Sequence, residues 1–519
     1  MSKNGTGFDL ALPERDAKIP SYLWLYGALR AEILEGRLRP GVRLPATRDL
    51  ARQYSLSRGT IVNAFEQLQS EGYVEGAVGS GTFVTKVLPE ELLKVRSDAL
   101  AQPPRKSKNA RRVLSNYGRR VEHLTGYEQR RFRAFRANVP AMDLFPMDLW
   151  TQLTSRRLRR LSADLLLGCE ALGYRPLREA LADYLNASRG VKCTADQLVI
   201  VSGMQEALDL AARLFVNPGD TVAVENPGYV GAVATFEAAG AKIAAVPLDN
   251  EGVCVKDARM RGARLVYVTP AHQFPLGINM SLCRRLDLLA WARKNSAMIF
   301  EDDYDSEYRY SGRPVPALQG LDCSGQVIFA SSLSKVMFPA LRLGYMVVAP
   351  DLVDYFAAAK SVATSHSALL EQAVLCDFIQ EGHFGRHIRR MRGIYSERLQ
   401  VLLNETQKHL KGLLEISAVE AGLQTVGWLR EGMNGMAAAK AASARGVEVV
   451  PLSKYARAPF SCVWPSREGV RREGLQLGFA AIDEKEIRRG VQELATALEQ
   501  LCRVKRTMKR GRAAKTAEG

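Results

Sequence analysis

The sequence contains no long run of uncharged apolar residues and no paired cysteine motif. No window approaches the ~18 apolar residues that cross a bilayer, so no membrane-spanning helix is expected. Residues 1–7 lack the apolar core of a signal peptide. The eight cysteines include no Cys-x-x-Cys pair, which argues against a disulfide framework and against a zinc site. We therefore expect no metal ion and a reducing, cytoplasmic location.

The positive charge of the chain is unevenly distributed. Of the formal net charge of +17, residues 89–136 carry +8 and residues 503–519 carry +6, whereas residues 137–502 carry only +1. A local excess of Lys and Arg is typical of a segment that contacts a polyanion, most simply DNA. For the C-terminal segment alone, a contribution to solubility explains the charge equally well.

Length and composition indicate more than one folded domain. The chain has 519 residues, of which 47% are hydrophobic and 24% charged, and these values exclude a largely disordered protein. We divide it into a compact N-terminal unit over 16–88, a basic linker over 89–136, a large domain over 137–502 and a basic tail over 503–519.

The pattern in residues 16–88 predicts three helices followed by a β-hairpin. Apolar residues at helical spacing predict a helix near 22–33, a second helix over 47–54 with Thr47 as its cap, and a third after Ser57. Two short strands then flank a glycine-rich tip. This order is that of a winged helix-turn-helix, although an unrelated helical bundle with a hairpin would show the same spacing.

Five segments of this unit resemble the winged-helix domain of GntR-type regulators, namely 38–41, 44–51, 57–60, 71–73 and 79–84. The resemblance spans nearly all of 20–86. It implies that the residues at matching positions contact DNA, and these are Arg48, Ser57, Arg58, Thr60 and Gly79. The family usually has Thr or Ser where this chain has Gly59, so one expected hydroxyl contact is missing.

Residues 137–502 alternate short strand-like segments with helical stretches. Five apolar, β-branched segments are expected as strands, at 198–201, 221–224, 265–268, 297–300 and 327–330. Helical patterns lie between most of them, which predicts a largely parallel α/β sheet buried on both faces.

Residues that can perform chemistry follow three of these strands. Lys335 can form a Schiff base, and the hydroxyls and the arginine near it can hold a phosphate. A buried carboxylate in the segment 301–303 could pair with a protonated pyridine nitrogen, and the phenol of Tyr304 could bond a ring hydroxyl. Residues 202–207 join a strand to a helix, where backbone N–H groups favour a phosphate. Taken singly, each cluster could instead be an exposed lysine, a capping carboxylate or a connecting turn.

Together, in this chain order, the clusters resemble those of fold-type I aminotransferases. The resemblance is closer to the MocR/GabR type of regulator, which fuses a GntR-like domain to an aminotransferase-like domain, and it covers about 20–502. The segments of the large domain that carry it, besides the one around Lys335, are 143–146, 225–229, 269–275, 301–310 and 477–480.

The resemblance implies pyridoxal 5'-phosphate as the cofactor. It implies Lys335 as the lysine that forms the Schiff base, Asp302 on the pyridine nitrogen and Tyr304 near the ring hydroxyl. It also implies Tyr229 over the ring face. The residues implied around the phosphate are Gly203, Met204, Gln205, Ser332 and Arg342.

The chain departs from working aminotransferases at three places. Phe274 replaces the Asn of their Asn-Pro pair, so His272 or Gln273 is expected to substitute near the ring hydroxyl. Gln476 replaces the Arg that clamps the substrate α-carboxylate, and a neutral amide lacks the charge for that task. Residues 173–178 form a shorter segment than the usual loop near the dimer interface.

These features predict a transcriptional regulator that depends on pyridoxal phosphate. The winged helix would bind operator DNA as part of a homodimer, and the large domain would sense the cofactor or an amino compound that displaces Lys335. One alternative is an active aminotransferase that carries a DNA-binding domain, against which Gln476 weighs. Another is a DNA-binding protein whose large domain has lost the cofactor, against which the intact set of Lys335, Asp302, Tyr304 and Arg342 weighs.

Overall fold

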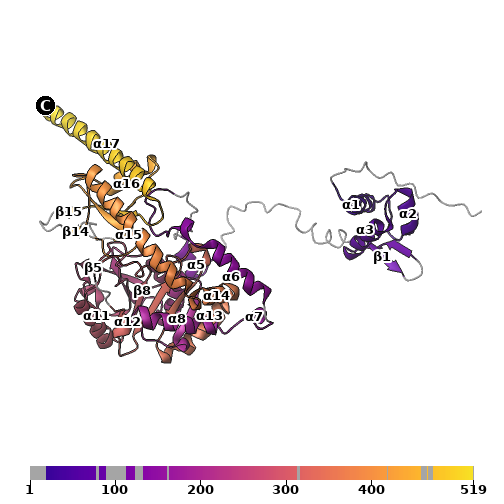
Figure 1. Ribbon diagram of the computed structural model, residues 1–519, viewed down its shortest axis with the longest axis horizontal. Helices are drawn as coiled ribbons and strands as arrows, with labels where there is room; N and C mark the ends of the chain where they lie inside the picture. The colour runs from indigo at the N-terminus through magenta and orange to yellow at the C-terminus, as the bar shows by residue number, and fades with distance from the viewer. Residues whose placement is uncertain are drawn as a thin grey trace, which may run out of the picture. The chain divides into compact units, whose positions relative to one another are not determined.

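A computed structural model of the chain separates two compact units, and the division falls between Val113 and Leu114 (Figure 1). The structure describes residues 19–77, 81–88, 113–122, 133–160, 163–312, 316–417, 419–457, 464–465 and 471–517. Among these residues, no helix combines the length and the apolar character needed to cross a bilayer.

The N-terminal unit has the predicted order of three helices and a hairpin. Helices α1 (Ser21–Leu34), α2 (Thr47–Gln53) and α3 (Arg58–Ser70) precede an antiparallel pair, β1 (Val74–Ala77) and β2 (Gly81–Val84). One core joins all of these elements, because apolar residues recur on the inner face of each helix. Its fully buried members include Leu25, Leu29, Leu50, Ile61, Leu68 and Val84.

Helices α2 and α3 differ in how their first turns are capped. The prediction that Thr47 caps α2 is wrong, because Thr47 is the first helical residue and Ala46 before it has no side chain that can cap. Ser57 does cap α3, and its Oγ accepts from the N–H of Thr60 at 3.1 Å. A side-chain acceptor at this position satisfies one of the unpaired N–H groups at the start of the helix.

An eight-stranded sheet forms the centre of the large unit, in the order β3-β10-β9-β8-β7-β4-β5-β6. All strands point the same way except β10 and β6, so the predicted, largely parallel sheet is confirmed. The strands are β3 (Leu198–Val201), β4 (Thr221–Asn226), β5 (Lys242–Asp249), β6 (Gly252–Val253), β7 (Ala263–Val268), β8 (Met298–Asp303), β9 (Val327–Ser332) and β10 (Gly344–Val347).

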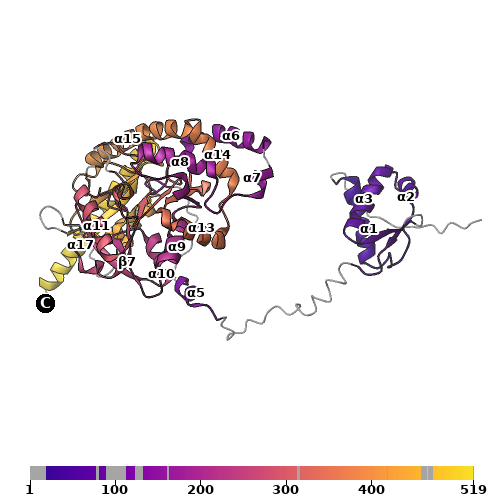
Figure 2. The same ribbon diagram turned by 90° about the horizontal axis from the view of Figure 1, so that it is seen from below.

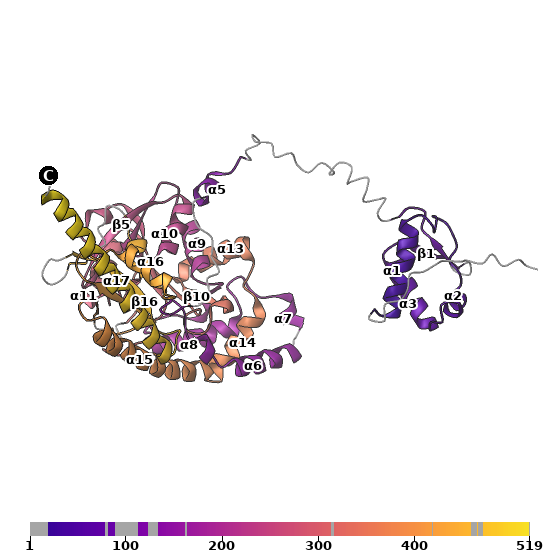
Figure 3. The same cartoon turned by 90° about the horizontal axis from the view of Figure 1, so that it is seen from above.

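Helices cover both faces of this sheet, as Figure 2 and Figure 3 show. Leu198 and Ile200 of β3 pack in one core with α8 (Arg175–Ser188) and α14 (Leu369–Gln380). Val199 and Val201 pack in the other core with helices on the opposite face. Those helices are α9 (Met204–Phe215), α10 (Val230–Ala239) and α13 (Val353–Thr364). The remaining helices of this part are α6 (Met147–Arg159), α7 (Ala163–Leu167), α11 (Leu282–Asn295) and α12 (Leu318–Leu321).

A smaller antiparallel sheet follows, in the order β11-β12-β16-β13. Its strands are β11 (Leu414–Ile416), β12 (Gln424–Leu429), β16 (Gly474–Gly478) and β13 (Val450–Pro451). The helices packed with it are α15 (His383–His409), α16 (Gly435–Ala444) and α17 (Glu484–Ala517). Two further elements are the pair β14 (Trp464–Pro465) and β15 (Arg471–Arg472) and the short helix α5 (Asn116–Val121).

The core of this part includes residues that the sequence pattern assigned to the linker. Ala134 and Phe135 are buried there, and the carbonyl of Phe135 accepts from the N–H of Gly478 at 2.9 Å. The packed structure therefore extends to the N-terminal side of residue 137.

Candidate functional site

The strand order brings three of the predicted clusters to one place. Gly344 of β10 lies opposite Val201 of β3 on one side and opposite Ser332 of β9 on the other. The carboxyl ends of β3, β9 and β8 therefore meet at one edge of the sheet, where ligands of parallel α/β sheets bind. The segments that begin at Ser202, Asp302 and Ser332 share this edge.

Lys335 lies in the turn that follows β9. Its ammonium donates to the backbone oxygen of Asn138 at 2.5 Å. Burial lowers the pKa of Lys335 to about 8, against the attraction of Asp305 and Asp302, which acts in the opposite direction. At neutral pH a larger share of this amine is uncharged than of an ordinary lysine, and the uncharged amine is the form that attacks an aldehyde.

Asp302 is buried at the end of β8. Its Oδ2 accepts from the hydroxyl of Tyr267 at 2.6 Å, and its Oδ1 has no hydrogen-bond partner among the described residues. Burial raises the pKa of Asp302 to about 7, although the Tyr267 hydrogen bond acts in the opposite direction. A buried acceptor without a partner fits a ligand that presents a proton, such as a protonated ring nitrogen.

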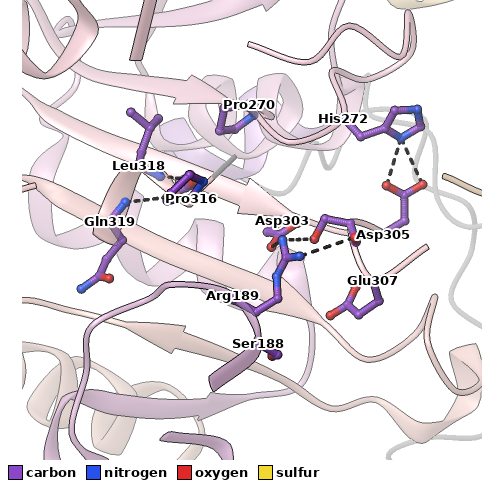
Figure 4. Close-up of polar contacts among 12 residues, drawn as sticks. Ser188, Arg189, Pro270, His272, Asp303, Asp305, Glu307, Pro316, Leu318 and Gln319 are labelled. Carbon is purple, nitrogen blue, oxygen red and sulfur yellow. Dashed lines mark hydrogen bonds and ion pairs between the residues drawn. The ribbon is translucent and has the colours of Figure 1, made fainter. Parts of the chain in front are cut away.

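Asp303 points to the other side of the strand, because successive side chains of a strand alternate. It forms an ion pair with Arg189 at 2.5 Å, and Figure 4 shows Arg189 between Asp303 and Glu307. These groups lie beside a separate cavity of about 290 Å³, which Arg189, Glu307 and Tyr184 help to line. The two neighbouring aspartates therefore have different partners. Asp302 bonds Tyr267, whose ring lies beside that of Tyr229, and Asp303 bonds Arg189.

His272 and Gln273, the two alternatives for the ring hydroxyl, have different surroundings. His272 Nδ1 lies 2.9 Å from Asp305 Oδ1 and 3.0 Å from the hydroxyl of Tyr304, and Figure 4 shows the ring facing Asp305. Gln273 is buried, and its amide donates to the carbonyl of Pro227 at 3.0 Å. The structure thus brings His272 to Tyr304, whereas the amide of Gln273 is engaged by the segment that follows β4.

The segment between β3 and α9 has the features of an anion site. Gly203 caps α9 with φ 128°, a conformation that residues with a Cβ rarely adopt. A Cβ at this position would lie 3.6 Å from Nη1 of Arg342, so the guanidinium lies beside the helix N-terminus. The N–H groups of the first turn and this guanidinium together favour a phosphate. Met204 and Gln205 belong to that first turn. Ser332 is the last residue of β9, which is separated from β3 by β10.

A buried ion pair supports this segment from inside the protein. The carboxylate of Glu206 accepts from the N–H of Ser202 at 2.5 Å and from Nζ of Lys360 at 2.7 Å. Lys360 is fully buried on α13. Its positive charge balances Glu206 and so limits the repulsion that Glu206 would exert on an anion nearby. Sequence reasoning missed this pair, since 154 residues separate its members and Lys360 belongs to no recognisable motif.

Aromatic rings form another wall of the site. The ring of Tyr229 packs against Tyr267 with centroids 6.5 Å apart and against Phe274 at 5.9 Å. Tyr455 meets Phe274 edge-on at 5.0 Å, and its hydroxyl donates to Oε1 of Gln476 at 2.7 Å. Gln476 is fully buried on β16, so its amide is covered in this structure. Tyr455 was also missed from the sequence, because no local pattern distinguishes it.

The N-terminal unit exposes most of the predicted DNA-contacting residues. Arg48 lies in the first turn of α2, and Ser57 and Arg58 lie at the start of α3; all three are exposed. Thr60 is half-buried, with its hydroxyl 2.8 Å from that of Ser57. The predicted contact at Gly79 lies outside the described residues.

The pKa of Lys335 leads to a test of its reactivity. In cofactor-free protein, acetylation of Lys335 by acetic anhydride should rise with pH and reach half of its maximum near pH about 8, because burial favours the neutral amine. Peptide mass spectrometry over a pH series measures this reaction, with a lysine-containing peptide as the control for an ordinary pKa of ~10.4. A half-maximum for Lys335 at the pH of the control peptide would contradict the expectation.

Comparisons with known proteins agree with this architecture. Residues 21–84 match the family model of bacterial regulatory proteins, gntR family, and residues 159–494 match that of aminotransferase class I and II. A kynurenine aminotransferase of Pyrococcus horikoshii is similar in structure, with a TM-score of 0.63 and 27% identity, covering 71% of this chain and 90% of that one. The α-aminoadipate aminotransferase LysN of Thermus thermophilus has a TM-score of 0.64 and 26% identity, covering 72% and 93%.

Two curated relatives extend over nearly the whole chain. The probable rhizopine catabolism regulatory protein MocR of Rhizobium meliloti is 39% identical over 93% of this chain and 95% of its own length. The pyridoxine biosynthesis transcriptional regulator PdxR of Corynebacterium glutamicum is 28% identical over 94% and 97%. The chain therefore belongs to the MocR-type transcriptional regulators, in which a GntR-family winged helix precedes an aminotransferase-like domain.

Proposed function

We propose that the large unit binds pyridoxal 5'-phosphate through Lys335, that this site senses the cofactor or an amino compound, and that the N-terminal unit binds operator DNA. The observation that carries the proposal is the meeting of three complementary groups at one sheet edge. They are an amine with a lowered pKa at Lys335, an acceptor without a partner at Asp302, and an anion-binding turn at Gly203 beside Arg342.

The residues present fit this cofactor. When bound, pyridoxal phosphate supplies an aldehyde that reacts with primary amines and a ring that withdraws electrons. Asp302 would accept a hydrogen bond from the protonated ring nitrogen, and this bond would give its Oδ1 the partner that it lacks among the described residues. The first turn of α9, Ser332 and Arg342 would hold the phosphate, and Tyr304 with His272 would lie near the ring hydroxyl. Tyr229 would cover a ring face.

We infer a homodimer and an amino-compound effector from the family. Fold-type I domains build their pocket at a dimer interface, so two winged helices per dimer would read paired half-sites. The names of the two relatives refer to rhizopine catabolism and to pyridoxine biosynthesis. Both names describe regulators of small-molecule metabolism, which supports the proposal that this chain senses a small molecule.

A second candidate is an active aminotransferase, which the similarity to the Pyrococcus and Thermus enzymes favours. Gln476 is the observation against it. This residue carries no charge, is fully buried and is bonded to Tyr455. A substrate α-carboxylate would therefore find no guanidinium at this position, and the Cα–H bond would lack the anchor that orients it.

The cofactor assignment predicts a coloured protein. After incubation with pyridoxal phosphate, the wild type should show a visible absorption band, and borohydride should fix the cofactor to Lys335. Lys335→Ala should abolish the band, whereas Lys294→Ala, at an exposed lysine of α11, should retain it. Absorption spectra measure the band, and peptide mass spectrometry after borohydride identifies the modified lysine. A colourless wild type would refute the assignment.

The DNA assignment predicts a specific loss at α3. Arg58→Ala should weaken operator binding by about 1–3 kcal/mol if Arg58 reads a base edge. The visible absorption band should stay unchanged, since the two sites lie in separate units. Arg213→Ala is the control, because this arginine pairs with Asp209 in the large unit at 2.7 Å. Fluorescence anisotropy with labelled duplex measures the affinities, and full operator affinity in Arg58→Ala would contradict the assignment.

Turnover is expected to be slow or absent. Rapid-mixing spectroscopy with a panel of amino acids should show little loss of the visible band over the time of a usual enzyme assay. Gln476→Arg should raise the rate at which the band disappears, because it restores a charged partner for the α-carboxylate of the amino acid. Rapid loss of the band when the wild type is mixed with a common amino acid would show that another group anchors the α-carboxylate. That result would favour the active aminotransferase.

A further inference from the structure

The C-terminal helix α17 is one continuous helix of 34 residues, from Glu484 to Ala517. Figure 1 and Figure 3 show its last turns extending beyond the rest of the large unit. We define residues 504–517 as the basic end of α17. This segment contains six Lys and Arg residues and no Asp or Glu, in a chain whose residues 137–502 are nearly neutral.

The first part of α17 is held to the protein by its apolar face. Its buried residues recur at intervals of three and four, and the last half-buried members of the core are Leu501 and Cys502. The fully buried members are Ile487, Val491, Leu494 and Leu498. The same spacing continues in the sequence to Val504 and Met508, and residues 509–517 contain no large apolar residue. An apolar repeat therefore does not explain why the helix continues beyond Met508.

Charge is also arranged differently in the two parts of the helix. Arg488 pairs with Glu484 at 2.9 Å, and Arg489 pairs with Glu486 at 2.6 Å. These pairs at i, i+3 and i, i+4 neutralise the cations of the first part. The basic end has no acidic residue with which such a pair could form within the segment. The sequence of the basic end therefore carries a net charge of +6.

We propose that the basic end of α17 is a second DNA-contacting element, which binds the phosphate backbone without reading bases. A helix of this length spans about 21 Å, and duplex DNA presents on the order of a dozen phosphates over that distance. Phosphate contacts release counterions and raise affinity for every duplex alike, whereas base contacts set preference. The proposal rests on the proposed DNA binding by the winged helix, which supplies the sequence preference that the basic end lacks.

The test replaces the six cations by Gln, which keeps a good helix former at each position. The six-fold variant changes Lys505, Arg506, Lys509, Arg510, Arg512 and Lys515 in the full chain. A three-fold variant changes only Lys505, Lys509 and Arg512. The matched control changes Arg488 and Arg489, which lie on the same helix but are paired. Circular dichroism and the thermal midpoint show whether each variant folds as the wild type does.

The measurement is fluorescence anisotropy with a labelled operator duplex and a scrambled duplex of equal length, over a series of salt concentrations. The slope of log affinity against log salt should become shallower by about 0.9 for each phosphate that the variant no longer neutralises. At low salt we expect the six-fold variant to lose at least ~10-fold in affinity for both duplexes, with an unchanged ratio between them. The three-fold variant should have a salt slope and affinities between those of the six-fold variant and the wild type. The control with changes at Arg488 and Arg489 should match the wild type in both quantities.

Each other outcome overturns the proposal in a recognisable way. An unchanged slope in the six-fold variant refutes it, and precipitation of that variant with the same slope would assign the charge to solubility. Loss of operator preference alone would mean that the basic end reads bases, which also contradicts it. If the wild type binds no duplex, the proposed function fails; if Arg58→Ala loses operator preference while the six-fold variant is unaffected, only this proposal fails.

Discussion

The close approach of three strands around Gly344 is the constraint on which the site depends. A Cβ at Gly344 would lie 2.8 Å from the carbonyl oxygen of Ser331 and 3.2 Å from the Cα of Gly203. Any side chain there would push β9 and the start of α9 apart. The turn at Gly203 that is proposed to bind a phosphate, Ser332 and the loop of Lys335 can share one edge of the sheet only because this position carries no side chain. The chemistry proposed for the site begins with this packing requirement.

Burial then sets the acid–base behaviour of the groups at that edge. It lowers the pKa of Lys335 to about 8 and raises the pKa values of Asp302 and Glu225 to about 7. Loss of water disfavours the charged form of both kinds of group, so the amine becomes a better nucleophile while the acids become better able to share a proton. Glu206 differs from these acids because it is only partly buried: desolvation acts to raise its pKa, but the hydrogen bond from Lys360 lowers it, and the ammonium of Lys360 balances its charge.

The sequence predicted those parts of the structure that leave a local or periodic pattern. The five strands, the three N-terminal helices and the cluster around Lys335 are each visible in a short stretch of residues. The predicted cap at Thr47 lies one residue after the observed N-cap position, Ala46, and the spacing of apolar residues does not locate a helix start to one residue. The pairs Glu206–Lys360 and Tyr455–Gln476 join distant segments through tertiary packing, so nothing within either segment indicates them. The burial of Phe135 was missed for the same reason, because a basic stretch surrounds it.

The hydrogen bond from Lys335 to the carbonyl of Asn138 connects the reactive amine to the segment that follows the buried Phe135. Asn138 is held on its other side, where its N–H donates to Gln424 at 2.9 Å, and Phe135 is held by Gly478. An amine that turns to a different partner leaves the Asn138 carbonyl without its donor. An amine engaged by the proposed cofactor would therefore leave the segment from Phe135 to Asn138 with one hydrogen bond fewer, while its bonds to Gly478 and Gln424 remain.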